Sequence, residues 1–342
     1  MQYSTFAAID IGSYDVILEI FEISKKQGIR SVDKICHRME LGKDTYTLGK
    51  IRPEMEEELC RVLADFVRIM EGYRVDAYRA MASSAISEAA NSLYVLGKIR
   101  QLTGLSVTVL SNSEQRFLGY KALAAMEDNF NKVIEKGTAI LDLDGGSFQI
   151  SLFDKDALVT TQNIRMGSLR VRERLAGIQS ETEHYEEMVE ELIWNEVSSF
   201  KKMYLKDRKI ENIMLIGDVF TDSVYQNIEE KTTKIISREN FNTWYEKIIR
   251  QSPMELAVKL GIPLENASLM YPSAVIYKCL IDMMEAEHVW IPGVHMTRGI
   301  AYEYAEQMKL QKGSHNFEND ILMAAKNIGK RYAVNRPHVQ NL

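Results

Sequence analysis

Residues 6–23 read FAAIDIGSYDVILEIFEI, and residues 138–153 read TAILDLDGGSFQISLF. Each stretch holds an apolar run, a short turn containing Gly and Ser, and a second apolar run, which is the pattern of two β-strands joined by a tight turn. The expected strands span 6–11 and 16–23 in the first stretch, and 138–143 and 148–153 in the second. The chain therefore repeats one plan, and a molecule of two similar halves is predicted.

The segments around these stretches favour an α/β fold. Pro53 opens a segment with apolar residues at a spacing of three and four that ends at Gly72, as in an amphipathic helix. Short apolar runs at 107–110 and 213–216 predict further strands. A chain of 342 residues is long enough for two domains. The predicted boundaries are 1–118 for the N-terminal domain, 119–310 for the second domain, and 311–342 for a linker and a helical extension.

The composition is that of an ordinary globular protein, with 46% hydrophobic residues, 26% charged residues and a formal net charge of −6. No window approaches the ~20 apolar residues of a membrane span, and the first residues do not resemble a signal peptide. We therefore expect a cytoplasmic protein with no membrane partner. Cys36, Cys60 and Cys279 lie far apart in the sequence, which argues against a disulfide framework and against a zinc site. The acidic balance argues against a nucleic-acid partner.

The two Gly-Ser turns suit a ligand that carries phosphate groups. Tight turns take glycine where φ is positive, and their backbone N–H groups can then face phosphate oxygens. Taken singly, such a turn is more often an ordinary hairpin, so the order of short motifs along the chain carries more information. These motifs are DIGS at 10–13, LG at 41–42, ASSAISEAAN at 82–91, SNSEQ at 111–115, DLDGGS at 142–147, MGS at 166–168 and TRG at 297–299.

This series resembles the exopolyphosphatase and guanosine pentaphosphate phosphohydrolase (Ppx/GppA) family, and the resemblance covers nearly the whole chain. It implies two ribonuclease-H-like (actin-like ATPase) α/β domains with the active site in the cleft between them, followed by a helical segment. It also implies a hydrolase that releases terminal phosphate from inorganic polyphosphate or guanosine pentaphosphate (pppGpp), with Mg²⁺ as cofactor. Polyphosphate or a guanosine polyphosphate is thus the expected partner. By analogy with the family, the protein is expected to form a homodimer.

The resemblance assigns roles to individual residues. Two glycine turns would cradle phosphates, a divalent ion would neutralise developing charge, and a carboxylate would activate water. Asp142 and Asp10 are the expected metal-side carboxylates. The predicted phosphate-binding residues are Gly12 and Ser13 in the first turn and Gly145, Gly146 and Ser147 in the second, together with the basic residues Arg165 and Arg170. A structural ion pair is the alternative role of each arginine.

Several site positions depart from the family pattern. Where two adjacent glutamates are usual, this chain has Glu114 and Gln115, and an amide cannot accept the proton of the attacking water. The first glycine of the second turn is Asp144, a later glutamate is Gln149, and an expected arginine is Ser87. The candidate catalytic positions are Glu114, Gln115, Asp142 and Asp144.

Two hypotheses of different class follow. In the first, the protein is a phosphoanhydride hydrolase in which Glu114, Asp144 or another carboxylate activates water. In the second, it is a catalytically degenerate relative, a pseudoenzyme that binds a phosphorylated ligand or a protein and acts as a sensor or scaffold. Substitutions at the site favour the second hypothesis, and the usual activity of the family favours the first. Because a fold does not fix function, the residues of the site must decide between them.

The end of the chain has two interpretations. After a linker at 312–316, apolar residues from Ile321 to Tyr332 predict a helix. The segment resembles the start of the helical HD-type domain that follows the core in longer family members. Alternatively, it is an ordinary C-terminal helix that packs back on the core.

Overall fold

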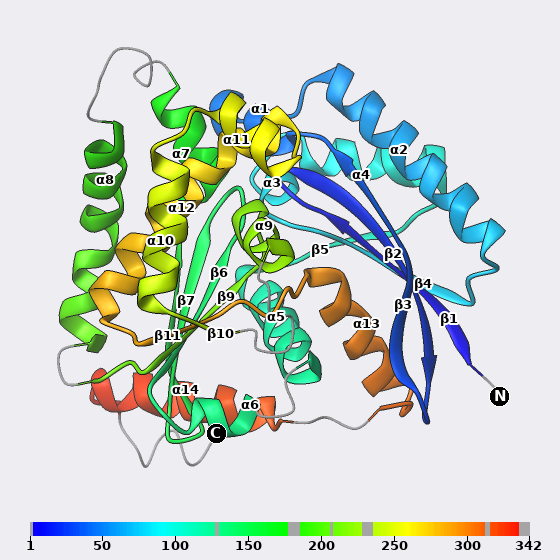
Figure 1. Ribbon diagram of the computed structural model, residues 1–342. Coiled ribbons are helices and arrows are strands. Elements are labelled where there is room, and N and C mark those ends of the chain that lie inside the picture. The colour runs from blue at the N-terminus through cyan, green and yellow to red at the C-terminus, as the bar shows by residue number, and fades with distance from the viewer. Residues whose placement is uncertain are drawn as a thin grey trace.

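Two β-sheets, one from each half of the chain, form the framework of the protein (Figure 1). The computed structural model describes residues 3–126, 130–176, 185–205, 208–227, 235–311 and 315–334. The strands of the first sheet are β1 (Ser4–Ile11), β2 (Asp15–Ser24), β3 (Gly28–Arg38), β4 (Ala77–Ala82) and β5 (Val107–Val109). Those of the second are β6 (Thr138–Leu143), β7 (Phe148–Asp154), β8 (Ala157–Ile164), β9 (Asn212–Ile216), β10 (Ile235–Ser237) and β11 (His288–Trp290).

The two sheets have the same core topology. The strand order is β3-β2-β1-β4-β5 in the first sheet and β10-β11-β9-β6-β7-β8 in the second. Each sheet begins with three antiparallel strands, β1-β2-β3 in the first and β6-β7-β8 in the second. Two further strands then extend each sheet on the other side of its first strand and run parallel to it: β4 and β5 beside β1, and β9 and β11 beside β6. This confirms the repeated strand, turn, strand plan and the mixed α/β fold predicted from the sequence.

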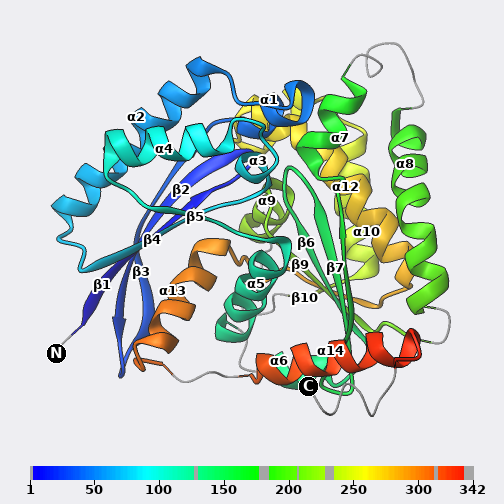
Figure 2. The ribbon, with the colours of Figure 1, turned by 180° about the vertical axis from the view of Figure 1, so that it is seen from behind.

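Helices cover both sheets (Figure 2). They are α1 (Leu41–Leu48), α2 (Pro53–Gly72), α3 (Ser84–Ser87), α4 (Ser92–Thr103), α5 (Asn112–Met126), α6 (Phe130–Ile134), α7 (Ser168–Leu175), α8 (Tyr185–Phe200), the π-helix η1 (Lys201–Leu205), α9 (Val219–Asn227), α10 (Arg238–Ile249), α11 (Pro253–Leu260), α12 (Leu264–Met284), α13 (Met296–Gln307) and α14 (Phe317–Arg331). The helix predicted from the apolar spacing at 53–72 is α2. Within the described ranges, none of the helices combines the length and the apolar character that a membrane crossing requires.

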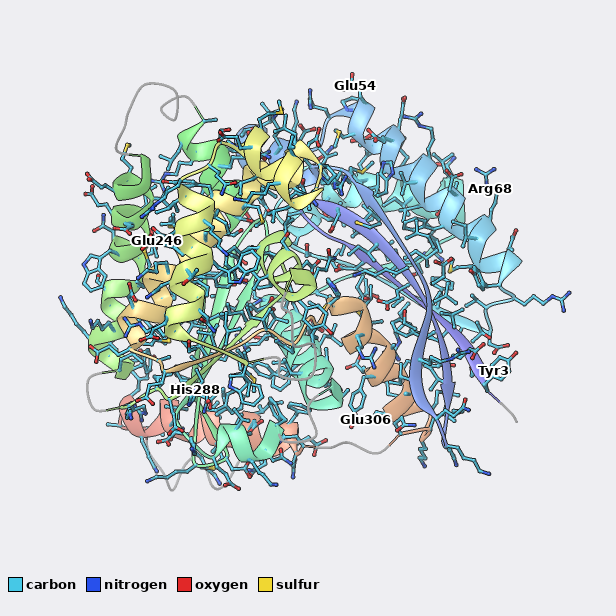
Figure 3. All side chains as sticks on the ribbon, viewed as in Figure 1. Tyr3, Glu54, Arg68, Glu246, His288 and Glu306 are labelled. Carbon is cyan, nitrogen blue, oxygen red and sulfur yellow. The ribbon has the colours of Figure 1, made fainter. Side chains whose placement is uncertain are left out.

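Alternation along β1 divides its side chains between two cores, because successive residues of a strand point to opposite faces. Ala7, Ile9 and Ile11 share a core with α2 and α4, whereas Phe6 and Ala8 share one with α5 and α13. The outer side of α2 carries charged residues such as Glu54 and Arg68, which point away from the sheet (Figure 3). The first sheet is therefore covered on both faces.

Helix α5 lies between the two sheets (Figure 1). Its Leu118 belongs to the core beneath the first sheet, and its Tyr120 and Leu123 belong to the core beneath the second. Helix α13 comes late in the chain, within the predicted second domain, and yet it packs against α5, β1 and β2. Gly299 allows this close packing, because a Cβ there would overlap the backbone carbonyl of Leu118. The TRG motif at 297–299 thus includes a glycine that serves helix packing.

Helix α14 packs against β8, the edge strand of the second sheet. Its first residue, Phe317, joins Tyr120, Phe130 and Phe153 in one aromatic cluster. This is the packing expected of a helix that folds back on the core. Residues 312–314 and 335–342 of the predicted extension lie outside the described residues.

Candidate active site

Asp10 and Asp142 occupy equivalent places near the ends of β1 and β6. Asp10 follows Phe6 and Ala8 on the face of β1 that looks toward α5, and Asp142 follows Ile140 on the face of β6 that looks toward the same helix. A Cβ on Gly119 of α5 would lie 3.5 Å from Oδ2 of Asp142. Strand alternation in each half thus directs both carboxylates into the space between the sheets.

A cleft of about 310 Å³ opens at this place. Of the predicted site residues, those that line it are Asp10, Gly12, Ser13, Gln115, Asp142, Asp144 and Gly145. The others, which are not among the described residues that line it, are Glu114, Gly146, Ser147, Arg165 and Arg170. The cleft therefore contains part of both glycine turns and three of the predicted carboxylates.

Asp144 turns its side chain back onto the second glycine turn. Its Oδ1 accepts hydrogen bonds from the backbone N–H groups of Gly146, at 2.5 Å, and Ser147, at 2.7 Å. Its Oδ2 accepts one from Nε2 of Gln115 at 3.0 Å. Burial raises the pKa of Asp144, and these hydrogen bonds partly offset that effect. The carboxylate is firmly held, and it occupies the N–H groups of Gly146 and Ser147.

Glu114 caps its own helix. Its Oε2 accepts hydrogen bonds from the backbone N–H of Ser111, at 2.8 Å, and from the Ser111 hydroxyl, at 2.7 Å, while the hydroxyl accepts from the Glu114 N–H. These bonds lower the pKa of Glu114. The next residue, Gln115, lies about 100° further around the helix and faces the cleft. Of the two predicted candidates for water activation, Asp144 reaches the cleft and Glu114 does not line it.

The spacing from Ser111 to Glu114 accounts for the position of this glutamate. Ser-x-x-Glu ahead of a helix is the sequence of a capping box, in which the serine and glutamate bond each other's backbone N–H groups. A glutamate used in this way is held at the helix terminus. The motif at 111–115 therefore carries a local signal that keeps Glu114 out of the cleft.

Buried carboxylates dominate the electrostatics of the cleft. The pKa of Asp10 is raised to about 8, first by burial and then by neighbouring carboxylates, of which Asp15 acts most strongly. Burial and the charge of Asp144 raise the pKa of Asp142 to about 7. Burial likewise raises the pKa of Asp218 to about 7. Six aspartates line the cleft, and the lysine and arginine among its described lining residues are Lys34 and Arg38.

Such an excess of carboxylates suits a divalent cation. Oxygen donors are the ligands that Mg²⁺ prefers, and it is usually held by one or two carboxylates, several waters and substrate phosphates. Within the described part of the chain, no three His, Cys, Asp or Glu side chains already converge on a metal-binding point. The donor chemistry of Asp10 and Asp142 therefore fits Mg²⁺ bound together with a ligand, and it does not form a complete protein cage.

The two arginines that were predicted to contact phosphate form ion pairs with one glutamate. Nη2 of Arg165 lies 2.5 Å from Oε2 of Glu88, and Nη2 of Arg170 lies 3.0 Å from the same oxygen. Arg170 also donates from Nε to the carbonyl oxygen of Gly146 at 2.8 Å. The structural ion pair, which was the alternative role of both arginines, is the arrangement found here.

The sequence did not indicate His295 and Asp222 as residues of the cleft. His295 and Asp222 both line it, with Nε2 of the histidine 3.3 Å from Oδ1 of the aspartate. Burial lowers the pKa of His295. A single histidine carries little sequence signal, although His295 stands just before the TRG motif. Asp222 lies on α9, the helix that follows β9, and no local pattern of the sequence marks this residue as part of a site.

Comparisons with known proteins agree with this architecture. Residues 19–308 match the Ppx/GppA phosphatase family. The bifunctional 3-dehydroquinate synthase/phosphatase of Fusobacterium nucleatum is 21% identical over 238 residues, which are 66% of this chain and 34% of that protein. Exopolyphosphatase 1 of Mycobacterium leprae is 25% identical over 144 residues, which are 42% of this chain and 41% of the relative. The match thus covers less than half the length of each of these curated relatives.

Solved structures show the same fold. An exopolyphosphatase from Cytophaga hutchinsonii has a TM-score of 0.79 at 16% identity, with 91% of this chain and 100% of that chain covered. The Ppx/GppA family member of Aquifex aeolicus has a TM-score of 0.73 at 18% identity, with the same coverage. Together with the family match over residues 19–308, these likenesses confirm the actin-like fold of two α/β domains with a cleft between them. This chain is a member of the Ppx/GppA phosphatase family.

Proposed function

We propose that the protein is a divalent-metal-dependent phosphoanhydride hydrolase that releases the terminal phosphate of inorganic polyphosphate or of pppGpp. The observation that carries the proposal is the meeting of Asp10, Asp142 and Asp144 with residues of both glycine turns in one cleft. Exopolyphosphatases among its relatives and structural neighbours support the substrate class.

Asp144 is our candidate for the group that activates water. It lines the cleft next to Gly145, and Gln115 fixes its Oδ2 by a hydrogen bond. A carboxylate at this position supplies the proton acceptor that the amide side chain of Gln115 cannot provide. Gln115 is then a positioning residue, which orients Asp144 and does not itself take a proton.

Asp142 and Asp10 are our candidates for holding Mg²⁺. Bound there, the ion would neutralise charge on phosphate oxygens. Gly12, Ser13 and Gly145 line the same cleft and would contact the phosphoryl group with backbone and hydroxyl groups. Lys34 and Arg38 add positive charge to the cleft wall, which favours the approach of an anion.

A second candidate function rests on a specific observation. Oδ1 of Asp144 already accepts hydrogen bonds from the N–H groups of Gly146 and Ser147, and Arg170 is engaged by Glu88 and Gly146. A turn filled by its own carboxylate binds phosphate more weakly. This favours a degenerate family member that serves as a phosphate-ligand sensor or a protein scaffold.

Phosphate release from long-chain polyphosphate and from pppGpp, measured with Mg²⁺, separates the two candidates. The variants are Asp142→Ala, Asp144→Asn and Gln115→Glu. Hydrolysis by the wild type that Asp142→Ala abolishes, and that Asp144→Asn lowers by about 10²–10⁴-fold, is the result expected for a hydrolase with Asp144 as base. An inactive wild type that gains activity in Gln115→Glu, where a carboxylate returns to position 115, would support the degenerate alternative.

A further inference from the structure

Exposure to solvent locates the mouth of the cleft. The exposed members of its described lining are Lys34, Cys36, Arg38 and Gln226. The first three lie on β3, the edge strand of the first sheet, and the fourth lies near the end of α9 in the second half. Ser13 and Gly145 of the two glycine turns are buried. The cleft therefore opens between β3 and α9, and the glycine turns lie inside it.

The strand register connects the interior of the cleft with this mouth. Asp10 pairs with Ile17 of β2, and Ile17 pairs with Cys36 of β3. Paired residues of neighbouring strands point to the same face of a sheet, and all three of these residues line the cleft. At ~4.8 Å per strand, this row runs about 10 Å from Asp10 to the edge of the sheet.

Lys34 and Arg38 flank the outer end of the row. They stand two residues before and two residues after Cys36, so the three side chains share one face of β3. With a rise of ~3.3 Å per residue, the Cα atoms of the two basic residues are about 13 Å apart. A ligand that leaves the cleft along the row passes between two positive charges.

The protein itself does not engage these two cations. Among the described residues, the side chains of Lys34 and Arg38 have neither a hydrogen-bond partner nor an ion-pair partner. Asp15 is the strand partner of Arg38, but its carboxylate accepts a hydrogen bond from Cys36 at 3.4 Å instead. The arginines at 165, 170 and 172, in contrast, are all paired with glutamates. Lys34 and Arg38 are thus available to an anionic ligand.

The lining of the cleft favours phosphate groups over a nucleobase at the mouth. Lys and Arg form strong charge-assisted hydrogen bonds with phosphate oxygens. A base of a nucleotide commonly stacks on an exposed aromatic ring. Tyr14 carries the one Phe, Tyr or Trp ring of the described lining, but it is only 7% exposed and its hydroxyl donates to Oδ1 of Asn266 at 2.8 Å.

We propose that Lys34 and Arg38 form an outer anion subsite at the mouth of the cleft, which binds the part of a linear phosphate chain that extends beyond the glycine turns. The inference rests on the proposed function insofar as that function places the terminal phosphate at those turns. Since the subsite lies at the edge of the sheet, it acts on chain binding and leaves the chemical step unchanged. Affinity should therefore increase once a chain is long enough to reach it.

The test compares Lys34→Gln, Arg38→Gln and the double variant on pyrophosphate, tripolyphosphate, long-chain polyphosphate and pppGpp. KM and kcat are measured with Mg²⁺ at low salt. Kd is measured by calorimetry at constant free Mg²⁺, in the Asp144→Asn background if the wild type hydrolyses the ligand. For long chains we expect KM and Kd to rise about three- to fivefold in each single variant and about tenfold or more in the double variant. The kcat value, and the Kd for pyrophosphate, should change less than about twofold.

Three control variants separate this effect from a general loss of charge. Lys25→Gln removes an exposed lysine from the turn between β2 and β3, outside the described lining of the cleft, and should bind like the wild type. Lys34→Arg and Arg38→Lys keep the charge and should retain most of the affinity for long chains. Added salt should reduce the difference between the wild type and the double variant, because exposed charges are screened. Urea unfolding establishes that each variant is folded.

The outcomes distinguish this inference from the proposed function. Hydrolysis by the wild type, with unchanged KM and Kd for long chains in the folded double variant, overturns the outer subsite and leaves the proposed function standing. Equal losses for pyrophosphate and long chains also overturn it, because the two cations would then only balance the carboxylates of the cleft. A loss for pppGpp as large as that for long chains overturns the inorganic chain as the occupant.

Binding of long chains without hydrolysis removes the proposed function, and the Kd series then decides the inference alone. A rise of Kd with chain-length dependence supports the outer subsite in that case. The absence of binding for every ligand of the series overturns both proposals.

Discussion

The two glycine turns are the same element twice, but they use their aspartates differently. In the first turn, the N–H of Gly12 donates to the backbone oxygen of Asp15 at 2.9 Å, and the Asp15 side chain accepts from Sγ of Cys36 at 3.4 Å. In the second, the side chain of Asp144 takes the N–H groups of Gly146 and Ser147.

The difference follows from where the aspartate stands relative to the glycine. Asp15 comes after Gly12 and begins β2; its side chain accepts from Cys36 of β3, and its Oδ1 lies 3.2 Å from the place of a Cβ on Gly12. Asp144 comes before Gly145 and Gly146, and a short side chain at the start of a turn readily bonds backbone N–H groups two or three residues ahead. In the first turn the backbone oxygen of Asp15 accepts a glycine N–H, and in the second turn the side chain of Asp144 accepts two N–H groups.

The largest effect is expected from the paired strand-end carboxylates. Asp142→Ala should lower phosphate release by about 10³-fold or more. The reason is that a metal ion held by this carboxylate would stabilise the charge of the transition state by several kcal/mol. Asp10→Asn, its equivalent in the first half, should lower it as well, and removal of divalent ions by chelation should abolish it. Steady-state kinetics with titrated Mg²⁺ check this. Full activity of folded Asp142→Ala would remove Asp142 from the metal site.

The next effect directly contrasts the two turn aspartates. Asp144→Asn keeps the shape of the side chain and an oxygen that can accept from Gly146, but it removes the proton acceptor. We expect kcat to fall about 10²–10⁴-fold, whereas Asp15→Asn should change it less than about tenfold. Single-turnover phosphate release measures both. Equal losses in the two variants would mean that the carboxylates act through charge alone.

A packing test addresses the contact between the halves. Gly146→Ala places a methyl group against Tyr46 and Ser84 and should lower the free energy of unfolding by about 1–3 kcal/mol. The matched control is Gly97→Ala on α4, where a Cβ meets nothing within 4 Å, and helix propensity should stabilise the protein by about 0.5–1 kcal/mol. Urea unfolding gives both values. Equal stability of the two variants would contradict the close contact.

The last effect concerns the pH dependence of stability. The pKa of Asp218 is raised by burial from 3.8 to about 7, so between these values the folded state binds a proton that the unfolded state has released. The stabilisation from this group is complete below pH ~4, and it is lost as the pH rises through about 7, at up to about 1.4 kcal/mol per pH unit. Asp218→Asn cannot ionise, so urea unfolding without Mg²⁺ at pH 5, 6, 7 and 8 should show a flatter decline than in the wild type. Parallel curves for the two proteins would contradict the shift.

Much of the fold follows from local pattern. The strands around residues 6–23 and 138–153 and the helix at 53–72 lie where apolar spacing predicts them, because a strand or helix must bury one face whatever it packs against. Strand alternation even sets the side to which Asp10 and Asp142 point. The position of Glu114 was within reach of the same local reasoning, because its capping spacing marks it as a helix cap, and the prediction that it activates water overlooked this signal.

The amino-acid sequence by itself determined the duplicated α/β plan, the two Gly-Ser turns and the placement of Asp10 and Asp142, since each depends on neighbours a few residues away. Only the tertiary structure decided that Tyr46 meets Ser13 and Ser84. It also decided that Glu88 pairs with both arginines and that α13 returns to the first sheet. Those contacts join residues from 33 to 82 positions apart in the sequence, or farther. The pairing of Glu88 with the arginines and the packing of α13 depend in addition on how the two halves come together. No periodicity along the chain records that closure.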